Sequence, residues 1–462
     1  MNKKYKVSNY NFFLETNDNH YLLYNSRSGA FASVPIEVKK DIDVIINNPN
    51  INQSHVIHRE LIEGGFIINN GENEIETLKS EMIDIVNMNR QLKLVLIPTE
   101  KCNFDCPYCY LYEHRSCDME DCVFEGVINL IKKSIVPNYK VIIQWLGGEP
   151  TLAHKKIMSF MKELNRLAKE NKFEDTIYNM ITNGYLLTDR TFRQYLDCGL
   201  RTFQITLDGT RDRHNKTRYL KNGKGTFDVI WRNLLNIKKI ESKFKIFIRS
   251  NFLKDDSDNC FEFIEQYEKA FGNDNRYAAY FYPVYQTETK RGAFCSVSNE
   301  LISFENGRLQ CLEYDASLAN KIDSLAGAGY LADKMPEPRP IACSCEKSNS
   351  WIVGADGLLY KCDQFISNKD YACGKITPDG SIEINERAQR WKNKLYDENN
   401  EKCLACKLLP ICQGGCKVSR KLTGIGCFYT IDEIYTKMLN AHKLRTGKYA
   451  EFEKVKNCQP TI

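Results

Sequence analysis

The fold is decided by two adjoining stretches, Leu92-Lys93-Leu94-Val95-Leu96-Ile97 and Thr99-Glu100-Lys101-Cys102-Asn103-Phe104-Asp105-Cys106-Pro107-Tyr108-Cys109. The first is mostly apolar and is stopped by Pro98, which predicts a buried strand. The second places Cys-x3-Cys-x2-Cys just beyond that strand, where α/β folds keep their ligand sites. Three local thiols leave a fourth coordination position open, as a catalytic metal centre requires. The spacing alone also admits a zinc knuckle whose fourth ligand comes from elsewhere.

Whole-chain properties narrow the class of protein. The 462 residues suggest two to four domains at ~100–200 residues each. The net charge of +5 is too small to indicate a nucleic-acid partner. We find no signal peptide and no apolar run of ~18 residues, so we expect a cytoplasmic protein with no membrane partner. In a reduced compartment, 19 cysteines indicate bound metal more than disulfides.

Strands and helices alternate after residue 92. Five more strands are expected, at residues 140–146, 176–182, 202–206, 244–251 and 278–284, with helical stretches between them. Such alternation predicts an α/β fold with a parallel sheet and helices outside. Six β/α units form an open or partial barrel.

A smaller module is expected at residues 1–75. It reads as strands at 11–15 and 21–25, helices at 35–47 and 54–63, and a closing strand at 66–68, a winged-helix-like order. A linker helix follows. The predicted domains are therefore 1–75, the linker 76–91, the barrel 92–310, a bridging segment 311–341, a cysteine-rich domain 342–440 and a tail 441–462.

Polar residues and glycines recur where the later barrel strands end. Glycines let a backbone approach a ligand closely, and a planar guanidinium suits a carboxylate. Singly, each residue is more often a turn or a solvated charge. The candidates are Gly147, Gly148, Glu149, Thr182, Asn183, Thr206, Asp208, Arg218 and Arg249.

A second set of cysteines lies in the last third of the chain. A Cys-x2-Cys pair within it also fits a structural zinc site. The other cysteines outside the two sets are scattered and are interpreted as packed or free thiols. The second set is Cys343, Cys345, Cys362, Cys403, Cys406, Cys412, Cys416 and Cys427.

The first cysteine motif, with Tyr108 before its last cysteine, resembles the signature of the radical S-adenosylmethionine (SAM) superfamily. This resemblance implies a partial (β/α)6 barrel and a 4Fe–4S cluster on Cys102, Cys106 and Cys109. SAM would chelate the open iron and be cleaved to a 5′-deoxyadenosyl radical that abstracts hydrogen from a substrate. Tyr108 and the strand-end residues above would contact SAM, with Arg218 pairing its carboxylate.

The second set resembles the SPASM domain, an iron–sulfur extension of radical SAM enzymes that modify peptides. It implies two auxiliary 4Fe–4S clusters, three in total. Cluster I would take Cys345, Cys362 and Cys416, with Cys343 completing it or leaving it open. Cluster II would take the remaining four cysteines. Asp363 matches an aspartate thought to accept a substrate proton in sulfatase-maturing relatives; an ordinary turn aspartate is an equal alternative.

The N-terminal module resembles the PqqD-like recognition element of ribosomal-peptide (RiPP) maturases. The implied partners are a precursor peptide, whose leader adds a strand to a sheet edge at 11–15 or 21–25, and an electron donor such as flavodoxin or ferredoxin. The implied reaction is an oxidative cross-link, most plausibly a cysteine thioether. The alternatives are a packing or dimerisation role for the module, an anaerobic sulfatase-type formylglycine maturase, and a zinc scaffold without catalysis.

Overall fold

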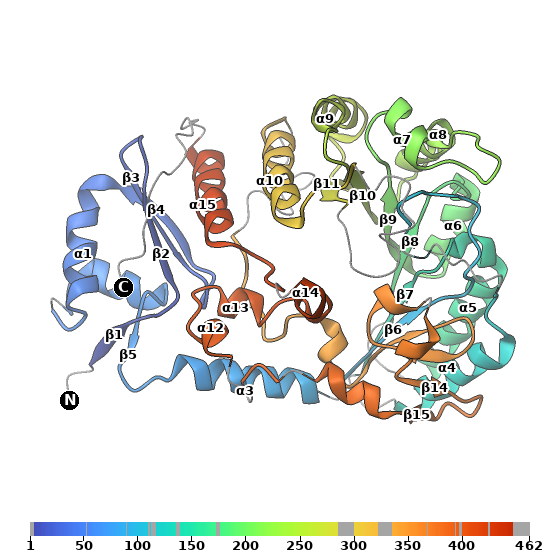
Figure 1. Ribbon diagram of the computed structural model, residues 1–462, viewed down its shortest axis with the longest axis horizontal. Helices are drawn as coiled ribbons and strands as arrows, with labels where there is room; N and C mark the ends of the chain where they lie inside the picture. The colour runs from blue at the N-terminus through green and yellow to red at the C-terminus, as the bar shows by residue number, and fades with distance from the viewer. Residues whose placement is uncertain are drawn as a thin grey trace.

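The computed structural model describes most of the chain (Figure 1). The tail predicted at 441–462 lies outside the described residues from 447 onward. None of the helices among the described residues is long and apolar enough to cross a membrane. The described residues are 4–51, 53–88, 90–109, 111, 117–134, 139–171, 176–284, 300–321, 335–366, 368–392, 394–396, 400–423 and 426–446.

Six parallel strands pair in chain order, which confirms the predicted parallel sheet of an open or partial barrel. Their side chains alternate between two faces, as strand geometry requires. The strands are β6 (Gln91–Leu96), β7 (Lys140–Trp145), β8 (Thr176–Thr182), β9 (Leu200–Thr206), β10 (Lys245–Phe252) and β11 (Tyr277–Pro283).

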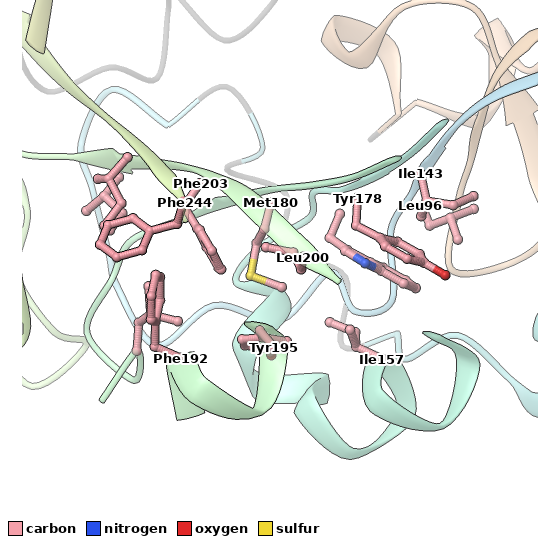
Figure 2. Packing of buried hydrophobic residues seen from close by; sticks show 14 of the residues in the cluster. Leu96, Ile143, Ile157, Tyr178, Met180, Phe192, Tyr195, Leu200, Phe203 and Phe244 are labelled. Atoms are coloured by element: carbon pink, nitrogen blue, oxygen red, sulfur yellow. The ribbon is translucent and has the colours of Figure 1, made fainter. Parts of the chain in front are cut away.

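Helices cover the outer face of this sheet (Figure 1). Apolar side chains from alternate strand positions pack against them and form the largest core, in which Trp145 and Phe203 are fully buried. Figure 2 shows Phe203 against Phe192 and Tyr195 of α6, with the Phe192 ring centroid 4.7 Å away. The helices are α4 (Asp121–Ser134), α5 (His154–Asn171), α6 (Asp189–Asp197), α7 (Arg211–Thr217), α8 (Phe227–Lys238), α9 (Ser257–Phe271) and α10 (Phe304–Lys321).

The cysteine-rich part extends the same sheet instead of standing apart from it. Strand β12 (Ser350–Val353) pairs parallel to β6, and three antiparallel strands continue outward. These are β13 (Leu358–Tyr360), β14 (Gly374–Ile376) and β15 (Ile382–Ile384). The short strands after residue 342 therefore belong to one ten-stranded sheet with the barrel.

The N-terminal module is built on an antiparallel meander of β2 (Asn11–Glu15), β3 (His20–Asn25) and β4 (Phe31–Pro35). One face packs on α1 (Lys39–Asn47) and α2 (Val56–Glu63). Two strands were not predicted: β4, and β1 (Tyr5–Val7), which pairs with β5 (Ile67–Asn69). Pro35 ends β4, so the first helix begins later than expected.

The other face of the meander packs against the C-terminal part of the chain. Phe12, Leu22 and Tyr24 share a core with Leu408, Ile411, Met438 and the thiol of Cys412. Helix α15 (Ile431–Thr446) stands between the meander and α10, and α3 (Glu74–Asn87) links the module to β6 (Figure 1). Three short helices follow, α12 (Glu401–Leu404), α13 (Leu409–Cys412) and α14 (Lys417–Thr423). Cys403 lies on α12 and Cys412 on α13, while Cys406 and Cys416 lie in the turns between these helices.

From the packing of this core we expect one substitution to lower stability strongly. Phe203→Ala should lower the free energy of unfolding by about 3–5 kcal/mol, because it leaves a cavity among rings that cannot collapse into it. Leu152→Ala is the matched control, since Leu152 is 45% exposed and should change little. Urea unfolding followed by circular dichroism measures both, and equal midpoints for the two variants would contradict the assigned packing.

Candidate active site

The first three cysteines lie on a loop that leaves the carboxyl end of β6. Cys102, Cys106 and Cys109 are all partly buried. Burial, with the nearby carboxylate of Glu149, raises the pKa of Cys102 to about 12. Burial likewise raises the pKa of Cys106 to about 12. Thiolates at these positions therefore need a compensating positive charge, which a metal centre supplies.

Two glycines after β7 hold this loop by close backbone contact. A Cβ on Gly148 would lie 2.2 Å from the carbonyl oxygen of Lys101, and one on Gly147 2.4 Å from that of Thr99. The amide of Gly148 donates to the Thr99 carbonyl at 3.1 Å, and the amide of Glu149 to the Lys101 carbonyl at 2.8 Å. The glycines therefore make room for the cysteine loop itself, beyond any approach to a ligand.

Glu149 joins the ends of β7 and β8. Its side chain is 1% exposed and its carboxylate accepts from the hydroxyls of Thr151 and Thr182 at 2.5 and 2.6 Å. It also accepts from the amides of Thr151 and Asn183, at 3.0 and 2.7 Å. Burial raises its pKa, while these donors act in the opposite direction. Because four protein donors already engage this carboxylate, its described role is to fix two strand ends.

Tyr108 is the centre of a second hydrogen-bond network, which joins residues at the ends of β9 and β10. Its hydroxyl donates to Asp208 and accepts from Arg218 at 3.1 Å and from the Asn251 amide at 3.2 Å. Asp208 is 2% exposed and also accepts from the Thr217 hydroxyl at 2.8 Å. Tyr108 lies between two of the cysteines, so this network ties the middle of the cysteine loop to the far strands.

The cysteine loop is also tied to β8 and to the segment after α7. Asn183 donates through its amide to the side-chain oxygen of Asn103 at 2.8 Å. The amide of Asp105 donates to the Tyr219 carbonyl at 2.9 Å, beside a β-bridge between Phe104 and Leu220. The strand-end residues predicted from the sequence thus converge on one edge of the sheet, Thr206 among them as a buried residue.

The two predicted arginines have different surroundings. Arg218 lies over the Phe104 ring at 5.6 Å, and its buried Nε has no hydrogen-bond partner among the described residues. Arg249 donates to the Asn251 side chain at 2.8 Å and stacks on the Tyr282 ring at 4.0 Å. Arg249 therefore lies along the barrel interior and is linked to the Tyr108 network through Asn251.

These residues fit a bound cluster with SAM. The three thiols are partly buried, and burial raises the pKa of Cys102 and Cys106 despite the opposing charge of Arg218, so a cationic centre would stabilise their thiolates. The orphaned Nε of Arg218 is a donor placed among these same residues, where it suits a carboxylate.

The later cysteines fall into two groups. Burial, together with the nearby thiols of Cys427, Cys406 and Cys403, raises the pKa of Cys412 to about 11, so these four cysteines lie near one another. The pKa of Cys362 is raised by burial, then by Asp363, Cys343 and Cys416.

Cys343 and Cys345 are direct neighbours. A hydrogen bond between their side chains lowers the pKa of Cys343 and raises that of Cys345. Asp363 accepts from the Cys362 thiol at 3.7 Å and begins a 3-10 turn. The structure therefore groups Cys343, Cys345, Cys362 and Cys416, with Asp363 beside them and away from the first cysteine loop.

The first cysteine loop and the group of Cys343, Cys345, Cys362 and Cys416 lie at opposite ends of β6. Strand β13 runs antiparallel to β12, so Cys362 emerges near the start of β6. There, Lys93 donates to Ser344 at 3.4 Å. The first cysteine loop begins after Ile97, roughly 13 Å further along the strand at about 3.3 Å per residue. The barrel interior separates the two groups.

Thiol spacing argues against zinc. Sulfur atoms that share one tetrahedral zinc ion at 2.3 Å stand about 3.8 Å apart. Among the described residues, no three cysteines have sulfur atoms within 4.8 Å of one another. In a cubane cluster each thiolate binds a different iron, which sets the sulfur atoms further apart. The zinc scaffold therefore fits this geometry poorly.

Comparison with known proteins agrees with this site. Residues 96–266, from the end of β6 into α9, match the model of the radical SAM superfamily. Residues 96–266 form a radical SAM domain. The chain is therefore an enzyme that carries a radical SAM domain, as the cysteine motif predicted.

Individual relatives resemble this radical SAM chain over much of its length. A cysteine-type anaerobic sulfatase-maturating enzyme of Clostridium perfringens is 25% identical over 353 residues, covering 71% of this chain and 90% of the relative. The radical SAM cyclopropyl synthase TigE of Paramaledivibacter caminithermalis is 26% identical over 271 residues, or 50% of this chain and 54% of that protein. The fold also matches the structure of native anSMEcpe with bound AdoMet, at a TM-score of 0.54 and 19% identity, covering 77% of this chain and 97% of that one.

Sequence reasoning missed several parts of the radical SAM site. Asn103, Thr217 and His214 each hold a predicted residue, His214 by accepting from the Asp208 amide at 3.2 Å. Asn103 stands inside the first cysteine motif, and His214 and Thr217 lie just before the predicted Arg218. Their hydrogen-bonding side chains were the only available signal, and such residues are common in loops.

The close contact at Gly148 predicts a loss of iron. Gly148→Ala should push the loop at Lys101 outward. After anaerobic reconstitution, the variant should therefore lack the iron of one cluster per chain. Gly71→Ala is the matched control, since a Cβ there meets only Asn69 at 3.8 Å. Iron and sulfide analysis checks this, and full iron content in the Gly148 variant would refute the contact.

Proposed function

We propose that this chain is a radical SAM peptide maturase of the SPASM type that forms an oxidative cross-link, most plausibly a cysteine thioether, in a ribosomally made precursor peptide. The observation that carries the proposal is the N-terminal meander, which packs directly on the part of the chain that holds the last cysteines. A module of this kind can deliver a peptide to a site that the same chain builds.

The cofactors of this proposal are SAM and a 4Fe–4S cluster on Cys102, Cys106 and Cys109. When bound, they supply a 5′-deoxyadenosyl radical that removes a hydrogen atom from the substrate. Arg218 would pair with the SAM carboxylate through its free Nε, and Tyr108 would hold the cysteine loop while Asp208 faces the ligand. Gly147, Gly148, Thr182, Asn183 and Thr206 line the same edge. Arg249 orients Asn251 from the barrel interior.

Two auxiliary 4Fe–4S clusters complete the proposal. Cluster I would take Cys345, Cys362, Cys416 and Cys343, because Cys343 and Cys416 both lie near Cys362 and Cys343 also lies near Cys345. Cluster II would take Cys403, Cys406, Cys412 and Cys427. Their position beyond the barrel interior suits groups that receive an electron from a substrate radical, and Asp363 would accept its proton. A flavodoxin or ferredoxin would reduce the first cluster.

The leader peptide would add to β4. The predicted edge at 21–25 is wrong, because β3 is the central strand and pairs on both sides. In β2, Asn11 and Phe12 are buried, whereas no residue of β4 is. The backbone amide of Asn25 donates to the Ala30 carbonyl, so these two residues form a hydrogen-bonded pair. Because such pairs alternate with non-hydrogen-bonded ones along an antiparallel ladder, the backbone groups of Phe31 and Ser33 point away from β3. These groups can bond an added strand.

The formylglycine maturase is the second candidate. It is favoured by the similarity to sulfatase-maturating enzymes and by the Cys362–Asp363 contact. Against it, the anSMEcpe structure matches almost completely and still leaves 23% of this chain unmatched. The unmatched part of the chain is consistent with a separate module for peptide recognition.

The first test is SAM cleavage. The reconstituted, reduced enzyme should form 5′-deoxyadenosine, and Cys106→Ala should abolish it because the cluster loses a ligand. Cys122→Ala is the control, since Cys122 is exposed and outside both cysteine sets. Zinc without sulfide, and no 5′-deoxyadenosine, would sink the proposal.

The second part of the test identifies the substrate. Co-expression with a short peptide encoded nearby should lower the peptide mass by two hydrogen atoms. Modification of a sulfatase-derived cysteine peptide alone, with a carbonyl-reactive product, would favour the second candidate.

The β4 edge gives a separate prediction. Ser33→Pro removes an outward amide and should weaken leader-peptide binding at least tenfold, which is about 1.4 kcal/mol. Ser33→Ala is the matched control, because it keeps the amide and loses only the hydroxyl. Fluorescence anisotropy with a labelled leader peptide measures both. Equal affinities would exclude β4 as the binding edge.

A further inference from the structure

Asp18, His20 and His442 meet at a place that the radical chemistry does not use. One ring nitrogen from each histidine and one carboxylate oxygen all lie within 4.8 Å of one another. The Nε2 of His442 is 2.9 Å from Oδ2 of Asp18, and the two imidazole centroids are 4.7 Å apart. His442 is fully buried, while Asp18 and His20 are partly exposed at the surface. The side chains of Asp18 and His20 are thus reachable from solvent, while that of His442 is not.

The surrounding groups orient these donors. The Nδ1 of His442 is 2.8 Å from the Ser33 hydroxyl, which leaves Nε2 facing Asp18. The other carboxylate oxygen of Asp18 accepts from the Thr16 hydroxyl at 2.5 Å. A histidine that binds a metal usually places its second nitrogen on a polar partner, and ligating carboxylates are hydrogen-bonded in turn. Both features are present here.

The position of the cluster also suits a cation. Asp18 lies in the turn from β2 to β3 and His20 begins β3, whereas His442 comes from the last part of α15, 424 residues from Asp18 in sequence. The carboxyl end of a helix carries a partial negative charge that favours a cation nearby. The cluster lies where α15 packs on the meander through Met438 and Ala441.

We propose that Asp18, His20 and His442 form a divalent transition-metal site of the zinc class, which fastens the N-terminal module to α15. Two imidazoles and one carboxylate match the ligand preference of such ions, and a fourth position stays open for water. The bound ion would fix the meander relative to α15 and the cysteine-rich part. This site is independent of SAM cleavage.

The test uses the fully reconstituted enzyme and Co²⁺ as the probe. Wild type should bind one further Co²⁺ per chain with ligand-field bands and no thiolate charge-transfer band, and Zn²⁺ should displace it. His20→Gln should lower Co²⁺ affinity at least tenfold, while it retains the His442–Asp18 contact and therefore the fold. His55→Gln is the matched control, since His55 is exposed and lies in the same module.

Stability gives a second readout. Zn²⁺ should raise the Tm of wild type and of the His55 variant, but not that of the His20 variant, because a ligand that binds only the folded state stabilises it. The proposal is overturned if wild type takes up no additional Co²⁺. It is equally overturned if His20→Gln binds Co²⁺ as tightly as wild type, which would leave a hydrogen-bonded His–Asp pair only.

Discussion

The backbone of the cysteine loop lies against Gly147 and Gly148 more closely than any side chain would permit. This contact sets the position of every group that follows. The contact places Cys102 beside the end of β7. It also positions Glu149 so that its carboxylate accepts from the end of β8 instead of binding a ligand. From there, Tyr108 carries the constraint to β9 and β10. A loop that would be mobile alone is thereby held by four strands.

Helix α15 has a comparable role at the other end of the molecule. Arg308 of α10 donates to Glu433 at 2.6 Å, and Glu433 is almost completely buried. Further along the same helix, His442 contacts Asp18 of the meander, about 13 Å from Glu433 at about 1.5 Å per residue, or roughly two and a half turns. One helix thus couples the barrel to the N-terminal module. Removing a partner from such a buried pair costs more than the pair contributes.

The shared sheet gives the cysteine-rich part a defined relation to the radical SAM domain. Because β12 pairs with β6 on one side and with β13 on the other, the loop after Ile97 and the turn at Cys362 are fixed at opposite ends of the sheet, two strands apart. A substrate in the barrel interior would lie between them. The fixed spacing therefore depends on backbone hydrogen bonds and not on the packing of two separate domains.

Short-range patterns in the sequence predicted the parallel strands, the cysteine loop and the residues at the strand ends. They did so because a buried strand and a motif beyond it are local features. The pairing of β12 with β6 joins segments about 255 residues apart, and no periodicity encodes it. The sequence alone determined the chemistry of the radical site, since Cys102, Cys106 and Cys109 carry their spacing with them. Only the tertiary structure decided the use of Glu149, the hub at Tyr108 and the meeting of Asp18 with His442, because each depends on distant backbones packed together.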